Sequence, residues 1–190
     1  MQARSRAARA LLSMAGWIPD GAPPDLPKYV VLAAPHTTLA DGLWMQAFAW
    51  HFGLDVDWLV KQSSTRGPGR VLPLLGAIPV DRSSPQGLIE ELARQFELRP
   101  RMRLVIAPEG TRARRAYWKS GFYHLARRAN VPVCLSYLDY RTKRGGFGPC
   151  IELTGNLRAD MDRIRAFYAG VTGARPHEFT PPRLREEDEA

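Results

Sequence analysis

Short apolar runs alternate with longer segments of helical periodicity along most of this chain. Six runs rich in β-branched or large apolar residues predict strands at 29–34, 56–60, 77–80, 102–107, 131–138 and 150–153. Four segments with apolar residues at helical spacing predict helices at 39–51, 84–98, 117–129 and 160–171. Because strands that alternate with helices are typical of α/β proteins, we expect a single α/β domain with a mostly parallel β-sheet flanked by helices.

Two glycine-rich stretches interrupt this pattern. Residues 62–70 indicate a turn-rich segment, and residues 143–149 indicate a hairpin or a flexible loop. Neither stretch is long enough to separate two domains. We therefore expect the folded domain to span residues 21–180.

The two ends of the chain differ from this domain in composition. Residues 1–20 mix arginines with Leu12, Trp17 and other apolar residues at roughly helical spacing, which predicts an amphipathic helix. Such a helix lies on an anionic lipid surface or packs on the domain's own core, and the sequence favours neither. Residues 181–190 are charged and poor in apolar anchors, so we expect a disordered tail.

The overall composition is that of a globular protein with an anionic partner. The 190 residues are 45% apolar and 24% charged, and they carry a formal net charge of +8. This charge is compatible with a phosphorylated substrate, an acidic lipid surface or nucleic acid. No apolar run approaches the ~20 residues that span a bilayer, and the first residues lack the apolar core of a signal peptide, so we expect an intracellular protein.

The two cysteines, Cys134 and Cys150, follow no metal-binding or redox spacing. We expect them to be reduced thiols that take part in packing, with neither a disulfide nor a zinc site.

The first candidate for catalysis is a histidine with a carboxylate close by. His36 follows the first predicted strand, and Asp41 lies five residues later. Imidazole accepts protons near neutral pH, and a neighbouring carboxylate fixes its tautomer. If Thr37 or Thr38 caps the helix that follows, both side chains face one pocket. Because no nucleophile motif such as Gly-x-Ser-x-Gly occurs, we expect the histidine to activate a substrate hydroxyl for direct transfer of a group from donor to acceptor.

Arginines follow two further predicted strands. Arg82 lies just after residues 77–80, and Arg112 ends the block Glu109-Gly110-Thr111-Arg112 after residues 102–107. The carboxyl ends of parallel strands are where ligands bind in α/β sheets, and guanidinium groups bind phosphate in bidentate fashion. If these arginines are more than solvated charges at strand ends, they would hold a phosphorylated acceptor near His36.

Taken in order, these blocks resemble those of the glycerolipid acyltransferases, typified by 1-acylglycerol-3-phosphate acyltransferase. The resemblance covers roughly residues 28–135. The blocks that carry it are His36-x4-Asp41, Gly76 to Asp81-Arg82, Pro108 to Arg112, Trp118-Lys119-Ser120-Gly121 and Val131-Pro132-Val133. The sequence departs from the family pattern at Pro35 and Thr38, which leaves the base intact, and at Pro79 and Val80, which alters the packing near the acceptor and puts its identity in doubt.

The resemblance implies a glycerol-3-phosphate acyltransferase-like fold in which residues 21–180 form the acyltransferase domain. It implies that His36 is the general base and that Asp41 orients it. The residues it assigns to substrate binding are Thr38, Arg82, Glu109, Gly110, Thr111, Arg112 and Lys119. The acyl donor would be acyl-CoA or acyl-ACP as co-substrate, with no metal and no other cofactor. For the oxyanion of the tetrahedral intermediate, we expect backbone amides near Thr37 and Thr38 as donors.

These features together predict an O-acyltransferase of phospholipid biosynthesis that acts on a lysophospholipid-type acceptor. We expect it to be peripheral on the cytoplasmic face of the membrane, attracted to an anionic membrane surface by its arginines. The alternatives are transfer to a non-phosphate lyso-lipid, and a lipid- or nucleic-acid-binding protein without catalysis. Nucleic acid is not expected as a partner, because no recognised binding module occurs. Trp44, Phe48 and His51 fit either an acyl-chain groove or, preferably, the core.

Overall fold

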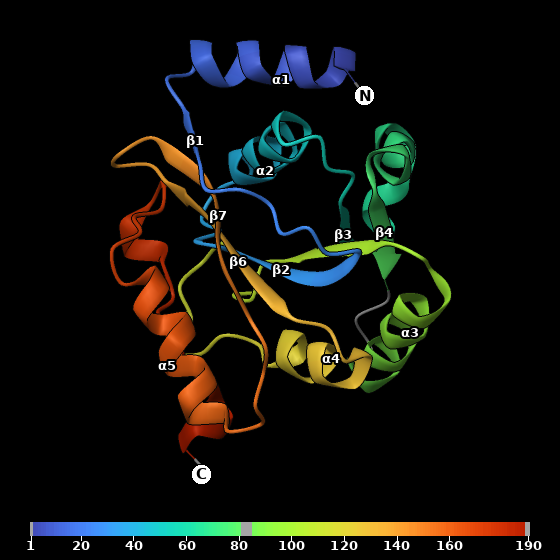
Figure 1. Ribbon diagram of the computed structural model, residues 1–190, viewed down its shortest axis with the longest axis vertical. Helices are drawn as coiled ribbons and strands as arrows, with labels where there is room; N and C mark the ends of the chain where they lie inside the picture. Colours follow the sequence, from blue (N-terminus) through green and yellow to red (C-terminus); the bar gives the residue numbers. More distant parts are fainter. Residues whose placement is uncertain (1, 81–84, 189–190) are drawn as a thin grey trace.

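The computed structural model describes residues 2–80 and 85–188 (Figure 1). Over these residues the strands are β1 (Ile18–Asp20), β2 (Lys28–Ala34), β3 (Asp57–Lys61), β4 (Ala77–Val80), β5 (Met102–Ile106), β6 (Val133–Asp139) and β7 (Arg144–Ile151). The α-helices are α1 (Gln2–Met14), α2 (Ala40–His51), α3 (Pro85–Leu98), α4 (Gly121–Ala129) and α5 (Leu157–Tyr168). Short 3-10 helices are η1 (Gln62–Thr65), η2 (Gly67–Leu75), η3 (Pro176–Glu178) and η4 (Arg185–Asp188).

The described strands form one seven-stranded sheet in the order β1-β7-β6-β2-β5-β3-β4. The strands from β6 to β4 in this order run parallel to one another, whereas β7 is antiparallel to β6 and β1 is parallel to β7. The predicted α/β fold with a mostly parallel sheet and flanking helices is therefore confirmed.

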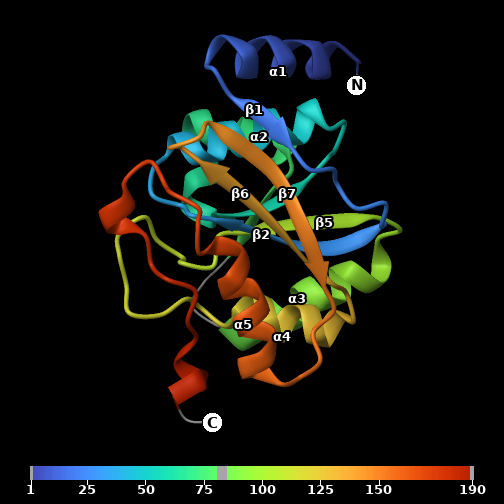
Figure 2. The ribbon, with the colours of Figure 1, turned by 60° about the vertical axis from the view of Figure 1, so that its left-hand side comes forward.

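Helices cover both faces of the sheet, as Figures 1 and 2 show from two sides. Alternate residues of β2 point to opposite faces. Val30 and Leu32 belong to the core cluster that also includes α3, α4 and α5, whereas Tyr29 and Val31 belong to the cluster that includes α2. Because β2 is buried on both faces, its sequence is almost continuously apolar, as is typical of a central parallel strand.

The first helix packs on the domain instead of standing apart from it. In α1, Ala8 and Leu12 are buried, and Leu12 belongs to a cluster with Trp17 and with Ala47 and Phe48 of α2. The sequence left open whether this helix lies on a lipid surface or packs on the domain's own core. In the structure, the face of α1 that carries Ala8 and Leu12 packs on the core. None of the helices in the described part of the chain is long and apolar enough to cross a membrane.

For residues 143–149 the sequence left a hairpin or a flexible loop open, and the structure forms the hairpin, because β7 is antiparallel to β6 with Asp139 opposite Arg144. Strand β7 thus corrects only the loop alternative. Its glycines allow neighbours to approach closely: a Cβ at Gly145 would lie 2.8 Å from the ring of Phe48, and one at Gly148 would lie 2.2 Å from the ring of Phe167. Glycines that make room for packed side chains look like turn residues in a sequence. The short strand β1 was also missed, because three residues give no periodicity.

The cysteine prediction is wrong in this structure. Cys134 on β6 faces Cys150 on β7, and the two form a disulfide with an S–S distance of 2.00 Å. The sequence spacing gave no signal, because the two residues meet only through the pairing of β6 with β7.

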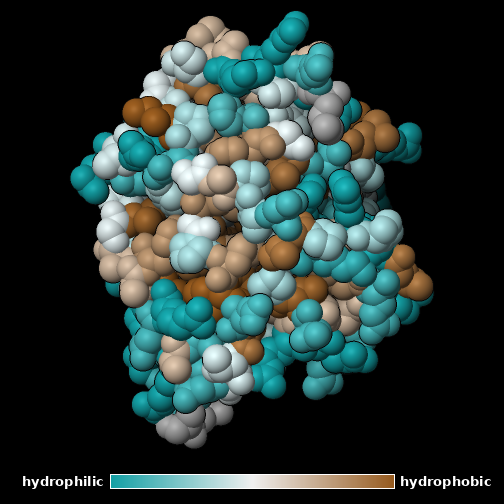
Figure 3. All heavy atoms as spheres, in the orientation of Figure 1, coloured by the Kyte–Doolittle hydropathy of each residue, from teal (hydrophilic) through white to brown (hydrophobic). Residues whose placement is uncertain are grey.

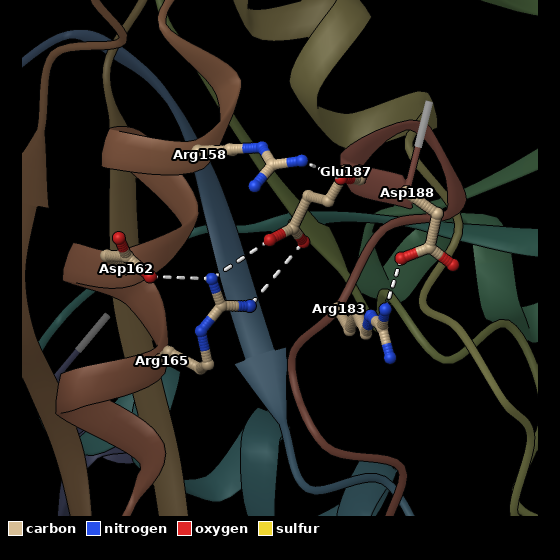
Figure 4. A pocket seen from close by; sticks show the side chains of 6 residues that line it. All are labelled: Arg158, Asp162, Arg165, Arg183, Glu187 and Asp188. Atoms are coloured by element: carbon tan, nitrogen blue, oxygen red, sulfur yellow. Dashed lines mark hydrogen bonds and ion pairs between the residues drawn. The ribbon is translucent and has the colours of Figure 1, made fainter. Parts of the chain in front are cut away.

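The expected disorder after residue 180 is also corrected through residue 188. Leu184 is fully buried, and the backbone N–H of Trp118 donates to the carbonyl of Arg183 at 2.8 Å. Figure 4 shows the contact with α5, where Arg165 pairs with Glu187 at 2.9 Å beside a cavity of about 360 Å³. One buried leucine and a few hydrogen bonds order a segment whose overall composition suggests disorder.

Candidate active site

The two sequence blocks meet where β2 and β5 end. These strands pair in parallel, with Leu32 opposite Ile106, so the residues that follow them emerge at the same edge of the sheet. His36 comes two residues after β2, and Glu109 comes three residues after β5. The backbone N–H of His36 donates to Oε1 of Glu109 at 2.9 Å, which joins the two blocks directly.

His36 and Asp41, the first two candidate residues of the sequence, lie next to each other in the structure. Nδ1 of His36 lies 3.4 Å from Oδ2 of Asp41. The His36 side chain is 30% exposed and the Asp41 side chain 5% exposed. The imidazole is thus reachable from solvent while its partner is buried. Because Nδ1 faces the carboxylate, Nε2 is the nitrogen left for a substrate.

Asp41 lies in the first turn of α2 and collects hydrogen bonds from several elements. Its Oδ2 accepts the backbone N–H groups of Thr37 and Thr38 at 2.7 and 2.8 Å. Its Oδ1 accepts the hydroxyls of Thr38 and Tyr140 at 2.8 and 2.5 Å. Burial alone would raise the pKa of Asp41, but hydrogen bonds from His36, Tyr140 and Thr38 outweigh it and lower the pKa to about 2. The carboxylate therefore stays ionised at neutral pH.

These contacts correct two expectations about the loop. Residue Leu39, and not Thr37 or Thr38, is the N-cap of α2, and it makes no side-chain cap bond. The backbone amides of Thr37 and Thr38, predicted as oxyanion donors, already donate to Asp41. Asp41, in the first turn of α2, thus fixes the loop, because the backbone amides of the loop donate to its carboxylate.

Glu109 is a buried carboxylate beneath the histidine. The residue is 3% exposed, and its Oε2 has no hydrogen-bond partner among the described residues. Burial is the main cause that raises the pKa of Glu109 to about 7, against the lowering effect of the His36 N–H. The resemblance places Glu109 in substrate binding; in the structure its contact is with the backbone of His36.

Gly110 and Lys119 lie together in the turn after β5. Gly110 has φ +65°, and a Cβ at this position would lie 2.8 Å from Cε of Lys119. The absence of a side chain thus lets Lys119 lie across the turn, and the Lys119 N–H donates to the Pro108 carbonyl at 2.8 Å. Thr111 is partly buried, and Arg112 is exposed. Arg82 lies outside the described residues.

A comparison with protein-family models matches residues 23–135 to the model described as Acyltransferase. The chain belongs to the acyltransferase family. This confirms the resemblance seen in the sequence and the prediction that the protein is an acyltransferase.

A solved structure supports the fold of this acyltransferase. The crystal structure of the 1-acyl-sn-glycerophosphate (LPA) acyltransferase PlsC from Thermotoga maritima matches with a TM-score of 0.61. The two chains are 14% identical, and the match covers 92% of this chain and 80% of that chain. At this identity the likeness shows the fold. A comparison with curated proteins finds no match.

The candidate site also contains residues that the sequence analysis missed. Tyr140, directly after β6, reaches Asp41, and the backbone N–H of Arg175 donates to Oγ1 of Thr37 at 3.2 Å. A Cβ at Gly173 would lie 3.0 Å from Pro35. Tyr140 could have been found from the rule that ligands gather at the carboxyl ends of parallel strands. The contacts of residues 172–175 with the loop after β2 depend on the tertiary packing of the chain, so no sequence pattern predicts them.

The aromatic stripe on α2 belongs to the interior of the acyltransferase. Phe48 is 4% exposed and packs on Trp17 with ring centroids 5.8 Å apart. Trp44 is partly buried and packs on Trp17 as well, at 5.6 Å. His51 is partly buried against Phe52, and burial is the first cause that lowers its pKa. The described residues include no group of three or more His, Cys, Asp or Glu side chains that could hold a metal ion.

Proposed function

We propose that this acyltransferase moves a fatty acyl group from acyl-CoA or acyl-ACP to the hydroxyl of a lysophospholipid-type acceptor such as 1-acylglycerol-3-phosphate. His36 is the general base and Asp41 its orienting partner. The observation that carries the proposal is the contact of His36 Nδ1 with a buried carboxylate that four further hydrogen bonds hold in place.

The proposed reaction needs one base and no covalent intermediate on the enzyme. Nε2 of His36 takes the proton of the acceptor hydroxyl as the oxygen attacks the thioester carbonyl. The tetrahedral intermediate then expels the thiolate, which receives the proton from the imidazolium. Asp41, ionised because its pKa is about 2, stabilises that imidazolium without taking the proton itself.

The acceptor's phosphate is proposed to meet cationic side chains around the turn after β5. Lys119 lies across Gly110, and Arg112 is exposed on the same turn. Both offer positive charge near the edge of the sheet where His36 lies. Arg82, Thr38 and Thr111 are included in the proposed binding site because of the sequence blocks to which they belong. Glu109 is proposed to fix the loop of His36 by accepting its backbone N–H, and Gly110 to allow the tight turn after β5.

The donor and acceptor carry long acyl chains, so the enzyme is proposed to work at the cytoplasmic face of a membrane. The formal net charge of +8 favours an anionic surface. Apolar residues lie across the middle of the face in Figure 3, with hydrophilic residues around them. Large apolar side chains are exposed at the start of α2 and on η2, at Leu39, Leu43, Val71 and Leu74.

Thiol release measures this function directly. Palmitoyl-CoA and palmitoyl-ACP are offered with lysophosphatidate, other lysophospholipids and a non-phosphate lyso-lipid. We expect release that depends on the acceptor and that falls by at least ~100-fold in His36→Ala, because a general base contributes ~10²–10⁴-fold. The control is His124→Ala, since His124 also faces a carboxylate, Glu186 at 3.8 Å, yet lies on α4.

The panel separates the alternatives. Thiol release only with the non-phosphate lyso-lipid would contradict the proposal that the acceptor carries a phosphate. No release with any pair would favour a lipid-binding protein without catalysis. Activity retained in His36→Ala would remove this histidine from the mechanism.

A further inference from the structure

Tyr140 touches the catalytic pair from outside the region that matches the family model. It follows β6 directly, and its hydroxyl donates to Oδ1 of Asp41 at 2.5 Å. Its backbone N–H donates to the carbonyl of Thr172 at 2.9 Å, which fixes the residue at its other end. The ring is partly buried, and burial followed by the bond to Asp41 raises the pKa of the phenol. Tyr140 therefore remains a hydrogen-bond donor at neutral pH.

Tyr140 supplies one of the two hydrogen bonds that Oδ1 of Asp41 accepts from described residues. Oδ2 of Asp41 has two backbone donors, which substitution of a side chain does not remove. Oδ1 has only hydroxyl donors among the described residues, those of Thr38 and Tyr140. Loss of the Tyr140 hydroxyl leaves Oδ1 with a single rotatable donor. The carboxylate plane, and with it the direction of the bond to His36, is then less well defined.

Trp17 holds Tyr140 in turn. The two rings meet edge to face with centroids 5.0 Å apart and an interplanar angle of 82°. Trp17 also packs on Trp44 and Phe48 of α2, the helix that carries Asp41. It is 3% exposed and its Nε1 has no hydrogen-bond partner in the described part of the chain, so ring packing is what holds it. The ammonium of Lys143 lies 5.0 Å from this ring.

The position of Trp17 ties this packing to the N-terminal helix. Its backbone N–H donates to the carbonyl of Leu12 at 2.8 Å, which closes the end of α1. Leu12 is buried in the same cluster. A continuous chain of contacts thus runs from α1 through Trp17 and Tyr140 to Asp41.

We propose that Trp17 and Tyr140 are positioning residues for the His36–Asp41 pair, so that the N-terminal segment contributes to the rate of acyl transfer through Trp17. This inference rests on the proposed function. Neither residue needs to touch the substrate. Their effect is on the orientation of the base, and a small misplacement of reacting groups costs rate more than binding.

The test compares steady-state kinetics of four variants. Tyr140→Phe keeps the ring and loses the hydroxyl; we expect kcat to fall about tenfold while KM for donor and acceptor stays within about twofold. Trp17→Ala is expected to lower kcat similarly, and Trp17→Phe to recover most of it. The matched control is Tyr123→Phe, because Tyr123 also donates to a buried aspartate, Asp160 at 2.9 Å, but on α4 and α5. A kcat for Tyr140→Phe equal to that of Tyr123→Phe overturns the inference, as does a loss confined to KM.

A measurement that needs no activity separates this inference from the proposed function. Tyr140→Phe, Asp41→Asn and the double variant are unfolded by heat. If the hydroxyl acts on Asp41, the losses in Tm are less than additive; additive losses overturn the inference. Trp17→Leu with Tyr140→Leu is tested in the same way, because each change removes one ring of the contact; this covers the case in which Trp17→Ala does not fold. If the wild type transfers no acyl group to any acceptor, the proposed function fails while these cycles still decide the role of the pair.

Discussion

Glu109 is placed where water cannot solvate its charge, directly under the backbone of His36. Its Oε1 accepts the His36 N–H and its Oε2 has no partner among the described residues. The protonated form is therefore favoured in the folded protein, which raises the pKa from 4.5 to about 7. Between these values the folded state binds the proton more tightly than the unfolded state, so the free energy of unfolding falls as pH rises across this window.

Replacing Glu109 by Gln removes this pH dependence. The variant is expected to gain stability relative to wild type between pH 5 and pH 8, by about 1–3 kcal/mol, since one pKa unit corresponds to about 1.4 kcal/mol. Urea unfolding at the two pH values measures the difference. The control is Glu97→Gln, whose side chain is 64% exposed. An equal effect of Glu109→Gln at both pH values would contradict a buried, protonatable Glu109.

That His36 and Asp41 lie side by side could be predicted from the residues, because a helix that starts between them brings both side chains to one side of the loop. Their spacing was weak as a signal by itself, and the blocks around Arg82 and Arg112 were needed to single the two residues out. The role of Thr37 and Thr38 was not predictable, because backbone amides leave no sequence signal. Tyr140 follows a predicted strand and could have been a candidate on that ground, but its contact with Asp41 depends on the order of strands in the sheet, which places the end of β6 beside the end of β2.

At the level of elements, residues 179–188 act as a strap, which contacts the segment that follows the turn of Glu109 to Arg112. The Nε1–H of Trp118 donates to the carbonyl of Thr180 at 2.7 Å, and the N–H of Arg115 donates to the Thr180 hydroxyl at 2.9 Å. Glu187 accepts the N–H of Leu184 and also binds Arg165 on α5. The strap thus ties residues 113–118 to α5, and its order depends on a small number of buried contacts.

Truncation of Leu184 tests the strap. This side chain is fully buried, so Leu184→Ala is expected to lower the free energy of unfolding by about 2–5 kcal/mol. Leu98→Ala is the control, because Leu98 at the end of α3 is 70% exposed and its loss is expected to stay within about 0.5 kcal/mol. Chemical denaturation of both variants gives the comparison. Equal small losses would mean that residues 181–188 are not docked in solution.

The strands were predictable where burial made them almost continuously apolar, as for β2 and β5. For β7 the hairpin was one of two predicted alternatives, but the length of the strand was missed, because its glycines, which admit the rings of Phe48 and Phe167, look like turn residues. Prediction failed for the strap, whose charges hide one buried leucine. In both cases tertiary packing, and not local preference, decides the structure.

On the scale of the whole molecule, the excess of positive charge bears on where the enzyme works. Arg6 and Arg9 are exposed on α1, which covers α2, whereas Arg127 and Arg128 are exposed on α4 under the opposite face of the sheet. A membrane that approaches the α1 side would meet the first two arginines and not the second two.

Vesicle sedimentation distinguishes the two sides. Replacing Arg6 and Arg9 together by Gln is expected to weaken binding to phosphatidylserine-containing vesicles about 30-fold, since each basic residue near the surface contributes ~1 kcal/mol. Replacing Arg127 and Arg128 in the same way is the control and is expected to have little effect. Binding of the wild type should fall with added salt. Equal effects of both double variants would show that the charge acts without a preferred face.

The central claim is that His36, oriented by Asp41, deprotonates the acceptor hydroxyl for acyl transfer from a thioester. The most direct measurement is mass-spectrometric detection of the ester product formed from palmitoyl-CoA or palmitoyl-ACP and lysophosphatidate by wild type, His36→Ala and His124→Ala. The account predicts product with wild type and His124→Ala and at least ~100-fold less with His36→Ala. Equal product from His36→Ala and wild type would contradict it.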